Sequence, residues 1–216
     1  TIPGDFEGDE FVLYARWEIT DIFDAGTEDV PFEIDSAELL SELARLVNGG
    51  KSYKGKYFAL AADIDLSETP WVPIGKQGAP FEGNFSAKVK NDTGEEPVNY
   101  EIKGLRIFTE DNYQGFFGCI KGATLQNLSV SGDVSGGNFI GGIAGYADVG
   151  ARFIDCINYC KVTVNSTAYY SYAGGIAAYA AGGVAFEGCR NDGNINGFQY
   201  AGGIVGYILN GSSGNE

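Results

Sequence analysis

The second half of the sequence contains one glycine-rich phrase three times. It occurs as NFIGGIAGYADVG from Asn138, as YAGGIAAYAAGG from Tyr172 and as YAGGIVGYILNG from Tyr200. A related phrase, QGFFGCI, begins at Gln114. Repeats of this kind indicate a stacked architecture, because each unit is too small to bury its own apolar face. The equivalent glycines lie 27, 33 and 28 residues apart, at Gly115, Gly142, Gly175 and Gly203.

The length of the repeat limits the fold further. A repeat of about 30 residues leaves no room for a helix of any length, and a four-stranded propeller blade needs about 40 residues or more. Thirty residues suit one coil of two or three short strands, with coils stacked about 4.8 Å apart. We therefore predict an all-β protein, a parallel β-helix-like solenoid. Its predicted coils span residues 113–137, 138–171, 172–199 and 200–216.

Composition agrees with this class and excludes several functions. The chain has 33 Gly, 14 Phe and 13 Tyr but only 6 Pro among 216 residues, which favours strands and tight corners. Its net charge of −15 repels phosphate backbones and anionic lipid surfaces, so we expect no nucleic-acid partner. No apolar run approaches the roughly 18 residues that span a bilayer, so we expect no membrane insertion by this segment. The absence of Met predicts a processed chain or an excised segment.

The absence of histidine is a second exclusion. Without His, neither a Ser-His-Asp nor a Cys-His catalytic arrangement is available, and zinc loses its commonest nitrogen ligand. The four cysteines are too few and too irregularly spaced for a disulfide framework. We expect no catalytic residue, no cofactor and no metal.

One amphipathic helix is predicted before the repeats, at Ser36–Asn48 within IDSAELLSELARLVNGG. Asp35 and Glu38 form a capping-box-like start, and Gly49 with Gly50 supplies the stop. We expect this helix to cap the open end of the β structure. Its apolar face is predicted to consist of Leu39, Leu40, Leu43, Leu46 and Val47.

The segments around this helix suggest two parts of the chain. Residues 1–30 are predicted to be a strand-rich remnant of a preceding module plus a linker, with a strand at Phe11–Ile19. Residues 31–216 are predicted to form the helix-capped solenoid. Further strands are expected at Lys56–Leu66 and Tyr100–Phe108. The polar segment between them, Ser86 to Asn99, is predicted to be an exposed hairpin or loop.

Aromatic residues recur at fixed positions of the repeats. One column contains Tyr146, Tyr179 and Tyr207, with Cys119 at the same position of the first repeat. This column is either a platform for sugar rings or a stacked ladder that seals the side of the coil. The segment STAYYSY adds Tyr169 and Tyr170, which we expect to be exposed. The candidate ligand platform is therefore Tyr146, Tyr169, Tyr170, Tyr179 and Tyr207. A second column contains Phe139, Tyr172 and Tyr200.

The repeated glycines themselves are interpreted as structural. A phosphate-binding loop needs a helix after the glycines and a Lys-Ser/Thr pair, and the sequence has neither after any of the three phrases. We expect these glycines to permit close approach of neighbouring coils and corners with positive φ.

Two other pairs of polar or sulfur-containing residues remain candidates. Asp63 and Asp65 could bind a metal or act in catalysis, but they more readily accept hydrogen bonds from backbone donors near a strand end. Cys156 and Cys189 share a repeat position and are either buried free thiols or a disulfide between adjacent coils. Asn158 and Asn191 also align and are predicted to form an amide ladder.

The repeated phrases GGIAGY, GGIAAY and GGIVGY resemble the GLUG-motif repeats of exported Bacteroides-type proteins. The lead-in SAELLSELARLVNGG, GKYFALAADIDLS, WVPIG, FEGNF and IKGLRI follows the same order, so the resemblance covers roughly residues 32 to 216. The insertion Ser86 to Asn99 departs from it. FVLYARWE, near the N-terminus, is similar to the end of a Listeria–Bacteroides repeat. These resemblances imply an extracellular surface or adhesin-like protein, and they carry no catalytic residues.

We therefore expect a non-enzymatic, adhesin-like or scaffold module of a bacterial surface protein. Its expected location is extracellular, and its expected partner is a glycan or a host or bacterial surface protein. The alternative is a carbohydrate-active β-helix enzyme, such as a polysaccharide lyase or glycoside hydrolase. That alternative requires Asp, Lys or Arg side chains that converge on one coil face. Arg152 and Arg190 do not share a repeat position, and Arg106 lies in the lead-in.

Overall fold

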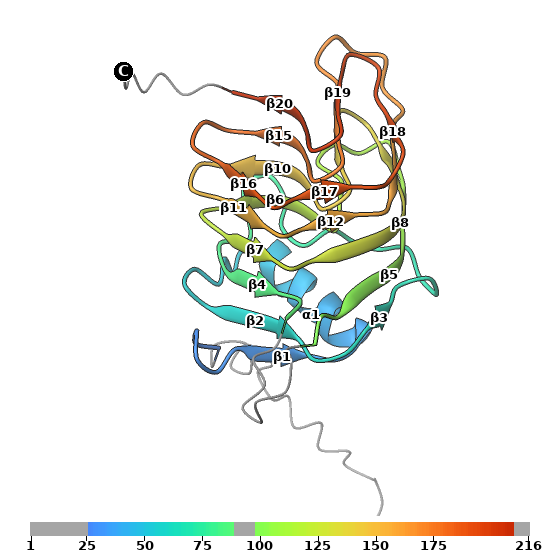
Figure 1. The fold of residues 1–216 in the computed structure, drawn as a ribbon. Coiled ribbons are helices and arrows are strands. Elements are labelled where there is room, and N and C mark those ends of the chain that lie inside the picture. The colour runs from blue at the N-terminus through green and yellow to red at the C-terminus, as the bar shows by residue number, and fades with distance from the viewer. Residues whose placement is uncertain (1–25, 89–97, 210–216) are drawn as a thin grey trace, which may run out of the picture.

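The computed structural model describes residues 26–88 and 98–209, and the strand predicted at Phe11–Ile19 lies outside them. The described chain is largely β, with twenty short strands and one helix. All pairings between its named strands are parallel. The strands lie in layers one above another from β1 to β20 (Figure 1). The all-β prediction is thus confirmed, and the parallel sheets are consistent with a β-helix.

Two of the four sheets form long walls of the stack. The six-stranded sheet has the order β1 (Phe32–Ile34), β2 (Tyr57–Leu60), β4 (Asn84–Ser86), β7 (Thr124–Gln126), β11 (Arg152–Ile154) and β16 (Ala185–Glu187). The seven-stranded sheet contains β3 (Ile64–Asp65), β5 (Glu101–Phe108), β8 (Ser129–Gly136), β12 (Ile157–Asn158), β13 (Lys161–Val164), β17 (Arg190–Asn191) and β18 (Ile195–Asn196).

The other two sheets carry the glycine-rich phrases. The four-stranded sheet has the order β20 (Val205–Ile208), β15 (Ala177–Ala180), β10 (Ala144–Asp148) and β6 (Phe117–Lys121). The three-stranded sheet has the order β19 (Tyr200–Gly202), β14 (Tyr172–Gly174) and β9 (Phe139–Gly141).

The repeat alignment is confirmed by the strand register. Tyr146 of β10 pairs with Tyr179 of β15 on one side and with Cys119 of β6 on the other. In the six-stranded sheet, Phe153 pairs in the same way with Leu125 and Phe186. Residues at the same repeat position therefore lie one above another in neighbouring layers.

The expected number of strands per repeat was too low. Residues 138–171 contain five strands, β9 to β13, in place of two or three, and none is longer than five residues. Lys56–Leu66 is likewise two strands, β2 and β3, which belong to different sheets. Strands this short show no clear alternation of apolar and polar residues, so their periodicity cannot reveal the corners between them.

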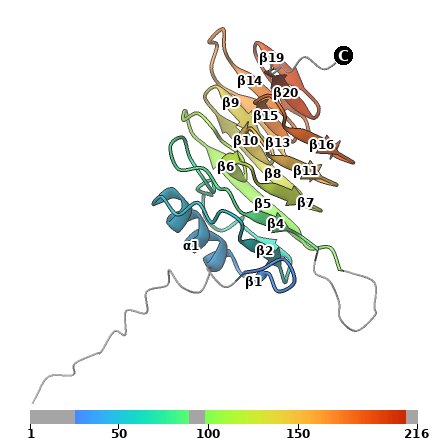
Figure 2. The ribbon, with the colours of Figure 1, turned by 90° about the vertical axis from the view of Figure 1, so that its left-hand side faces the viewer.

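The helix α1 (Ala37–Asn48) lies where the sequence predicts it, but its N-cap is Ser36 and not Asp35. Ser36 has an extended backbone, and its hydroxyl accepts a hydrogen bond from the backbone N–H of Leu39 at 3.5 Å. Position N3 is thus Leu39, so there is no capping box with Glu38. The helix lies beside β1 and β2, at the N-terminal end of the stack (Figure 2). Its buried residues belong to the common core: Leu40, Leu43, Ala44, Leu46 and Val47.

The paired glycines Gly141–Gly142 and Gly174–Gly175 permit close approach, as predicted, but they do not adopt positive φ. A Cβ atom added to Gly142 would overlap the Asn158 side chain, and one added to Gly175 would overlap the carbonyl of Gly203. The N–H of Gly175 donates to that carbonyl at 3.1 Å, so the two coils are joined at this point. The last glycine of each of the first two phrases, Gly150 and Gly183, has a positive φ, at 82° and 83°, so the predicted corners with positive φ lie at the ends of these phrases.

The candidate ligand-binding face

The tyrosine column forms a stack of rings on one side of the molecule. The Tyr146 and Tyr179 ring centroids lie 5.1 Å apart with 9° between the ring planes, and those of Tyr179 and Tyr207 lie 5.4 Å apart with 26°. These distances follow from the register, because in-register parallel strands place equivalent side chains about 4.8 Å apart. All three side chains are half-buried.

The second aromatic column stacks beside the first. The rings of Tyr172 and Tyr200 are 5.2 Å apart at 13°, and those of Phe139 and Tyr172 are 5.0 Å apart at 34°. Tyr113 extends this column by stacking on Phe139 at 4.7 Å and 18°. Tyr113 precedes the glycine phrase of the first repeat, a position that the sequence analysis did not single out.

Edge-to-face contacts join the two columns. The pairs Tyr172–Tyr179 and Tyr113–Tyr146 have centroid distances of 5.4 and 6.0 Å and interplanar angles of 79° and 87°. Each such contact contributes about 0.5–1.5 kcal/mol beyond burial. The seven rings form one cluster, which we call the aromatic ladder: Tyr113, Phe139, Tyr146, Tyr172, Tyr179, Tyr200 and Tyr207.

Burial affects the phenol groups of three residues of the aromatic ladder. Burial raises the pKa of the hydroxyls of Tyr146, Tyr172 and Tyr179 above the usual value for tyrosine. Among the described residues, the hydroxyls of Tyr146 and Tyr179 have no hydrogen-bond partner. Tyr146 and Tyr179 therefore present neutral hydroxyls that can donate or accept hydrogen bonds.

Tyr169 and Tyr170 lie apart from the ladder, in the loop between β13 and β14. Their exposed fractions are 64% and 65%, and their rings contact each other edge to face at 5.2 Å. The prediction that this pair is exposed is confirmed. Of the five candidate platform residues, three thus stand in one column and two in a loop that leads into Tyr172.

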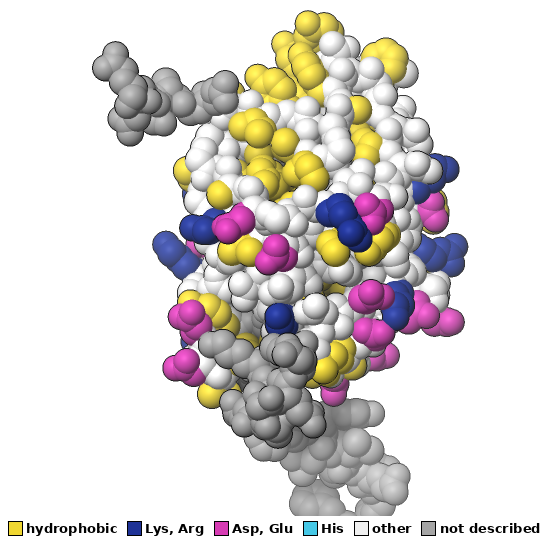
Figure 3. Space-filling view, viewed as in Figure 1, with side chains coloured by type: hydrophobic (Ala, Val, Ile, Leu, Met, Phe, Trp, Pro, Cys, Tyr) yellow, Lys and Arg dark blue, Asp and Glu magenta, His cyan; other side chains and the backbone are white. Residues whose placement is uncertain are grey.

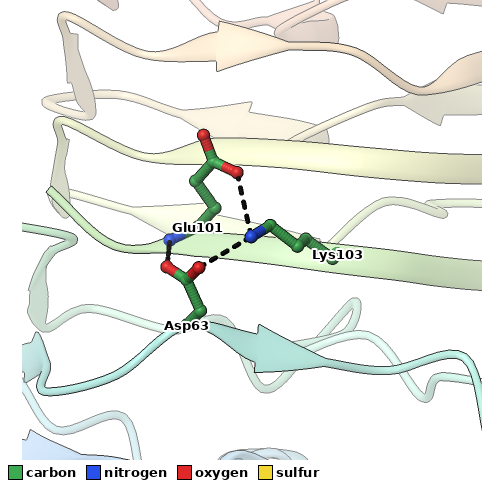
Figure 4. Close-up of polar contacts among 3 residues, drawn as sticks. All are labelled: Asp63, Glu101 and Lys103. Atoms are coloured by element: carbon green, nitrogen blue, oxygen red, sulfur yellow. Dashed lines mark hydrogen bonds and ion pairs between the residues drawn. The ribbon is translucent and has the colours of Figure 1, made fainter.

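Asp63 and Asp65 are engaged with the neighbouring backbone, as the structural interpretation predicts. Asp63 accepts a hydrogen bond from the N–H of Glu101 at 3.0 Å and one from Lys103 Nζ at 2.6 Å (Figure 4). The hydrogen bond from Lys103 is the main reason why the pKa of Asp63 lies below its usual value. Asp65 accepts from the N–H of Ser67 at 2.8 Å. The described residues contain no group of three or more His, Cys, Asp or Glu that could hold a metal ion.

The cysteines and asparagines inside the coil are structural. All four cysteines, including Cys156 and Cys189, are free thiols. Asn158 is fully buried, and its amide donates to Oδ1 of Asn191 at 2.7 Å, so the predicted amide ladder is confirmed. The same Asn158 side chain accepts from the N–H of Cys160 at 3.0 Å. These contacts satisfy polar groups that would otherwise be buried without partners.

The three arginines considered for an enzyme are each held on a different strand. Arg106 of β5 donates to the carbonyl of Ser67 at 3.2 Å. Arg152 of β11 lies 3.8 Å from a carboxylate oxygen of Glu187, and Arg190 of β17 lies 2.9 Å from one of Asp192. These positions do not give the cluster of side chains that the enzyme hypothesis requires.

No protein-family model matches the sequence. A curated protein from Evansella cellulosilytica, described as "Putative Gly-rich membrane protein", is 30% identical over 138 residues, which are 57% of this chain and 14% of that protein. A crystal structure described as a "putative immunoglobulin A1 protease" from Bacteroides ovatus superposes with a TM-score of 0.56 at 21% identity. The match covers 87% of this chain and 64% of that one, and at this identity it shows a shared fold alone. In the described residues, no helix has the length and apolarity needed to cross a bilayer.

Proposed function

We propose that this chain is a non-enzymatic, surface-displayed β-solenoid module that binds glycans. The observation that carries the proposal is the aromatic ladder, a wall of seven rings of which all but Tyr172 are half-buried, held on in-register parallel strands. Ligand sites combine apolar or aromatic walls with a few placed polar groups. A pyranose ring matches this surface, because it has apolar C–H faces and a polar rim of hydroxyls.

The proposed location is the cell surface or the extracellular space. The resemblance to GLUG-motif repeats supports it, as do the name of the Evansella relative and the origin of the Bacteroides structure. The chain's net charge of −15 suits a well-solvated surface and a neutral partner. In this proposal α1 caps the N-terminal end of the solenoid, and the coils form a rigid support for the ladder and for the loop that carries Tyr169 and Tyr170.

A glycan array combined with chromatographic analysis of the bound glycans tests the proposal. We expect the protein to retain glycans and to release no cleavage products. Replacing both Tyr169 and Tyr170 with alanine should weaken retention several-fold. The matched control is Tyr159→Ala, which removes another exposed tyrosine, between β12 and β13 of the seven-stranded sheet. A protein that retains no glycan contradicts the proposal, and cleavage products would establish the carbohydrate-active enzyme instead.

A further inference from the structure

The tyrosine column ends in a pocket. Cys119 occupies the column position one layer below Tyr146, and its side chain is much smaller than a tyrosine ring. One face of the Tyr146 ring stacks on Tyr179, while the space on the other side is left open by the cysteine. Because neighbouring layers are about 4.8 Å apart, the missing ring leaves a gap of about one ring thickness.

A tight turn forms the opposite side of this gap. Residues 76–79 are closed by reciprocal backbone hydrogen bonds between Lys76 and Ala79, at 3.0 and 2.9 Å. The turn is fixed to the layer of Cys119, whose N–H donates to the carbonyl of Gly75 at 3.1 Å. Gly75 has a φ of 81°, a conformation that side chains disfavour, so a glycine is required for the turn to approach the coil.

Tyr113 forms a side wall with an unusual backbone. Its φ is 61°, in the left-handed region that costs a non-glycine residue roughly 1 kcal/mol or more. Its ring stands at 87° to that of Tyr146. Strained residues of this kind concentrate at ligand sites, where the surrounding structure holds them in place.

The lining of the pocket combines apolar and polar side chains. Its volume is about 260 Å³, and its apolar walls are Tyr113, Pro80, Ile120 and Tyr146. Its polar lining side chains are those of Lys76, Gln77 and Asp148. Within residues 26–88 and 98–209, Lys76 has no ion-pair partner. Asp148 accepts from the N–H of Val149 at 2.8 Å and lies 3.8 Å from Lys121 Nζ, so its carboxylate keeps acceptor capacity.

We propose that this pocket binds one hexopyranose ring, which stacks on the free face of Tyr146 in the place of the missing tyrosine. Lys76 and Gln77 then donate hydrogen bonds to the ring hydroxyls, and Asp148 accepts them. The volume of about 260 Å³ suits a single sugar ring, because it is slightly smaller than the pockets of about 300–1,000 Å³ that hold larger, drug-sized ligands. This inference rests on the glycan-binding function proposed above and names its principal subsite.

The decisive variant places a tyrosine at the position of the tyrosine column that Cys119 occupies. Cys119→Tyr supplies the residue that the repeat has at this position in the later coils and fills the gap, whereas Cys119→Ser keeps the gap open. Binding is measured by saturation-transfer difference NMR with a panel of methyl hexopyranosides, with choline chloride as a cationic probe. We expect saturation transfer from at least one glycoside to the original protein and to Cys119→Ser, and at least a tenfold loss of affinity in Cys119→Tyr.

A second variant covers the case in which Cys119→Tyr does not fold, as judged by its melting transition. Lys76→Ala changes only an exposed side chain of the turn, and we expect it to weaken glycoside binding several-fold. If Cys119→Tyr folds, unchanged glycoside binding in this variant overturns the pocket assignment. If it does not fold, unchanged binding in Lys76→Ala overturns it. In both cases the proposed glycan-binding function stands. If the original protein binds no glycan on the array and no glycoside, both proposals fall. Binding of choline without any glycoside overturns the hexopyranose assignment.

Discussion

Core residues are buried to different extents at the two ends of the stack. At the N-terminal end, α1 and the large rings of Phe58, Phe81 and Phe85 leave no core residue exposed to more than a few per cent. At the C-terminal end, β16 to β20 are the end strands of their sheets, and the apolar side chains that face inward from them are only partly buried. Charged side chains lie mainly over the N-terminal part in the view of Figure 3, and apolar side chains gather over the C-terminal part.

Three columns of equivalent residues show this contrast in burial. Phe153, Cys156 and Ile176 are fully buried, whereas their equivalents one layer further, Phe186, Cys189 and Ile204, are half-buried. The side chains are chemically similar, so the difference arises from the neighbouring layer alone. Burial of these side chains is therefore supplied by the next layer of strands, as expected where repeats stack.

The largest effect expected from this contrast is on thiol chemistry. The hydrogen bond from Cys156 lowers the pKa of Cys189 to about 7, whereas the pKa of Cys156 lies well above the usual value. Because the thiolate is the nucleophile, iodoacetamide should modify Cys189 at least ~100-fold faster than Cys156 or Cys119 at pH 7.5. Burial raises the pKa of Cys119 to about 12, which keeps that thiol protonated.

Peptide mapping after timed alkylation measures these rates. The rate at Cys189 should fall as the pH is lowered through about 7, since its lowered pKa means that the thiolate is lost only below that value. The variant Cys156→Ala removes the donor and should move this transition to higher pH. Equal labelling of Cys156 and Cys189 would show that the two layers do not differ in accessibility.

The next largest effect concerns a buried charge. Ile176 is fully buried, so Ile176→Asp should cost several kcal/mol and unfold the coil cooperatively, because a typical domain is stabilised by only about 5–15 kcal/mol. Ile204→Asp, at the same position of the half-buried last coil, should cost only about 1–2 kcal/mol. Urea denaturation followed by circular dichroism compares the two. An unchanged midpoint in Ile176→Asp would show that this column does not fill the core.

A smaller effect is expected from cavities. Phe153 and Phe186 stack at 5.0 Å with parallel rings, but only Phe153 is fully buried. Phe153→Ala should destabilise the fold by about 3–5 kcal/mol, the usual range for a core phenylalanine. Phe186→Ala should cost less than half as much, because water already reaches one side of its ring. Thermal melting of both variants provides the measurement, and equal losses would contradict the layer argument.

The sequence predicted the columns better than the strands, for a physical reason. Identical residues at constant spacing, such as Tyr179 and Tyr207, must lie in register when equivalent strands pair, so the repeat alone determines that they meet. The strands themselves are only two to five residues long in residues 138–171, too short for a period to be recognised.

The pocket had no signal of its own in the sequence. The absence of a tyrosine at Cys119 was visible in the alignment of the repeats. However, Lys76 and Gln77 come from the lead-in, which does not repeat, and only the folded chain brings that turn beside Cys119. Tyr113 was missed because aligning Gly115 with Gly142 sets it opposite Ile140, whereas the bridge between Gln114 and Ile140 in the structure sets it level with Phe139.

The smallest expected effect concerns the N-cap of α1, at the N-terminal end of the stack. Ser36→Ala removes the N-cap hydrogen bond of α1 and should lower the free energy of unfolding by about 1 kcal/mol. Asp35→Ala is the matched control, since Asp35 is exposed and lies one residue outside the cap, and it should change stability by less than half of that. Urea denaturation of both variants shows whether Ser36 or Asp35 caps the helix. If the helix covers the core as its buried leucines indicate, the loss in Ser36→Ala should appear in the single transition of the whole stack. A separate early transition of the helix signal would mean that α1 folds independently of the coils it covers.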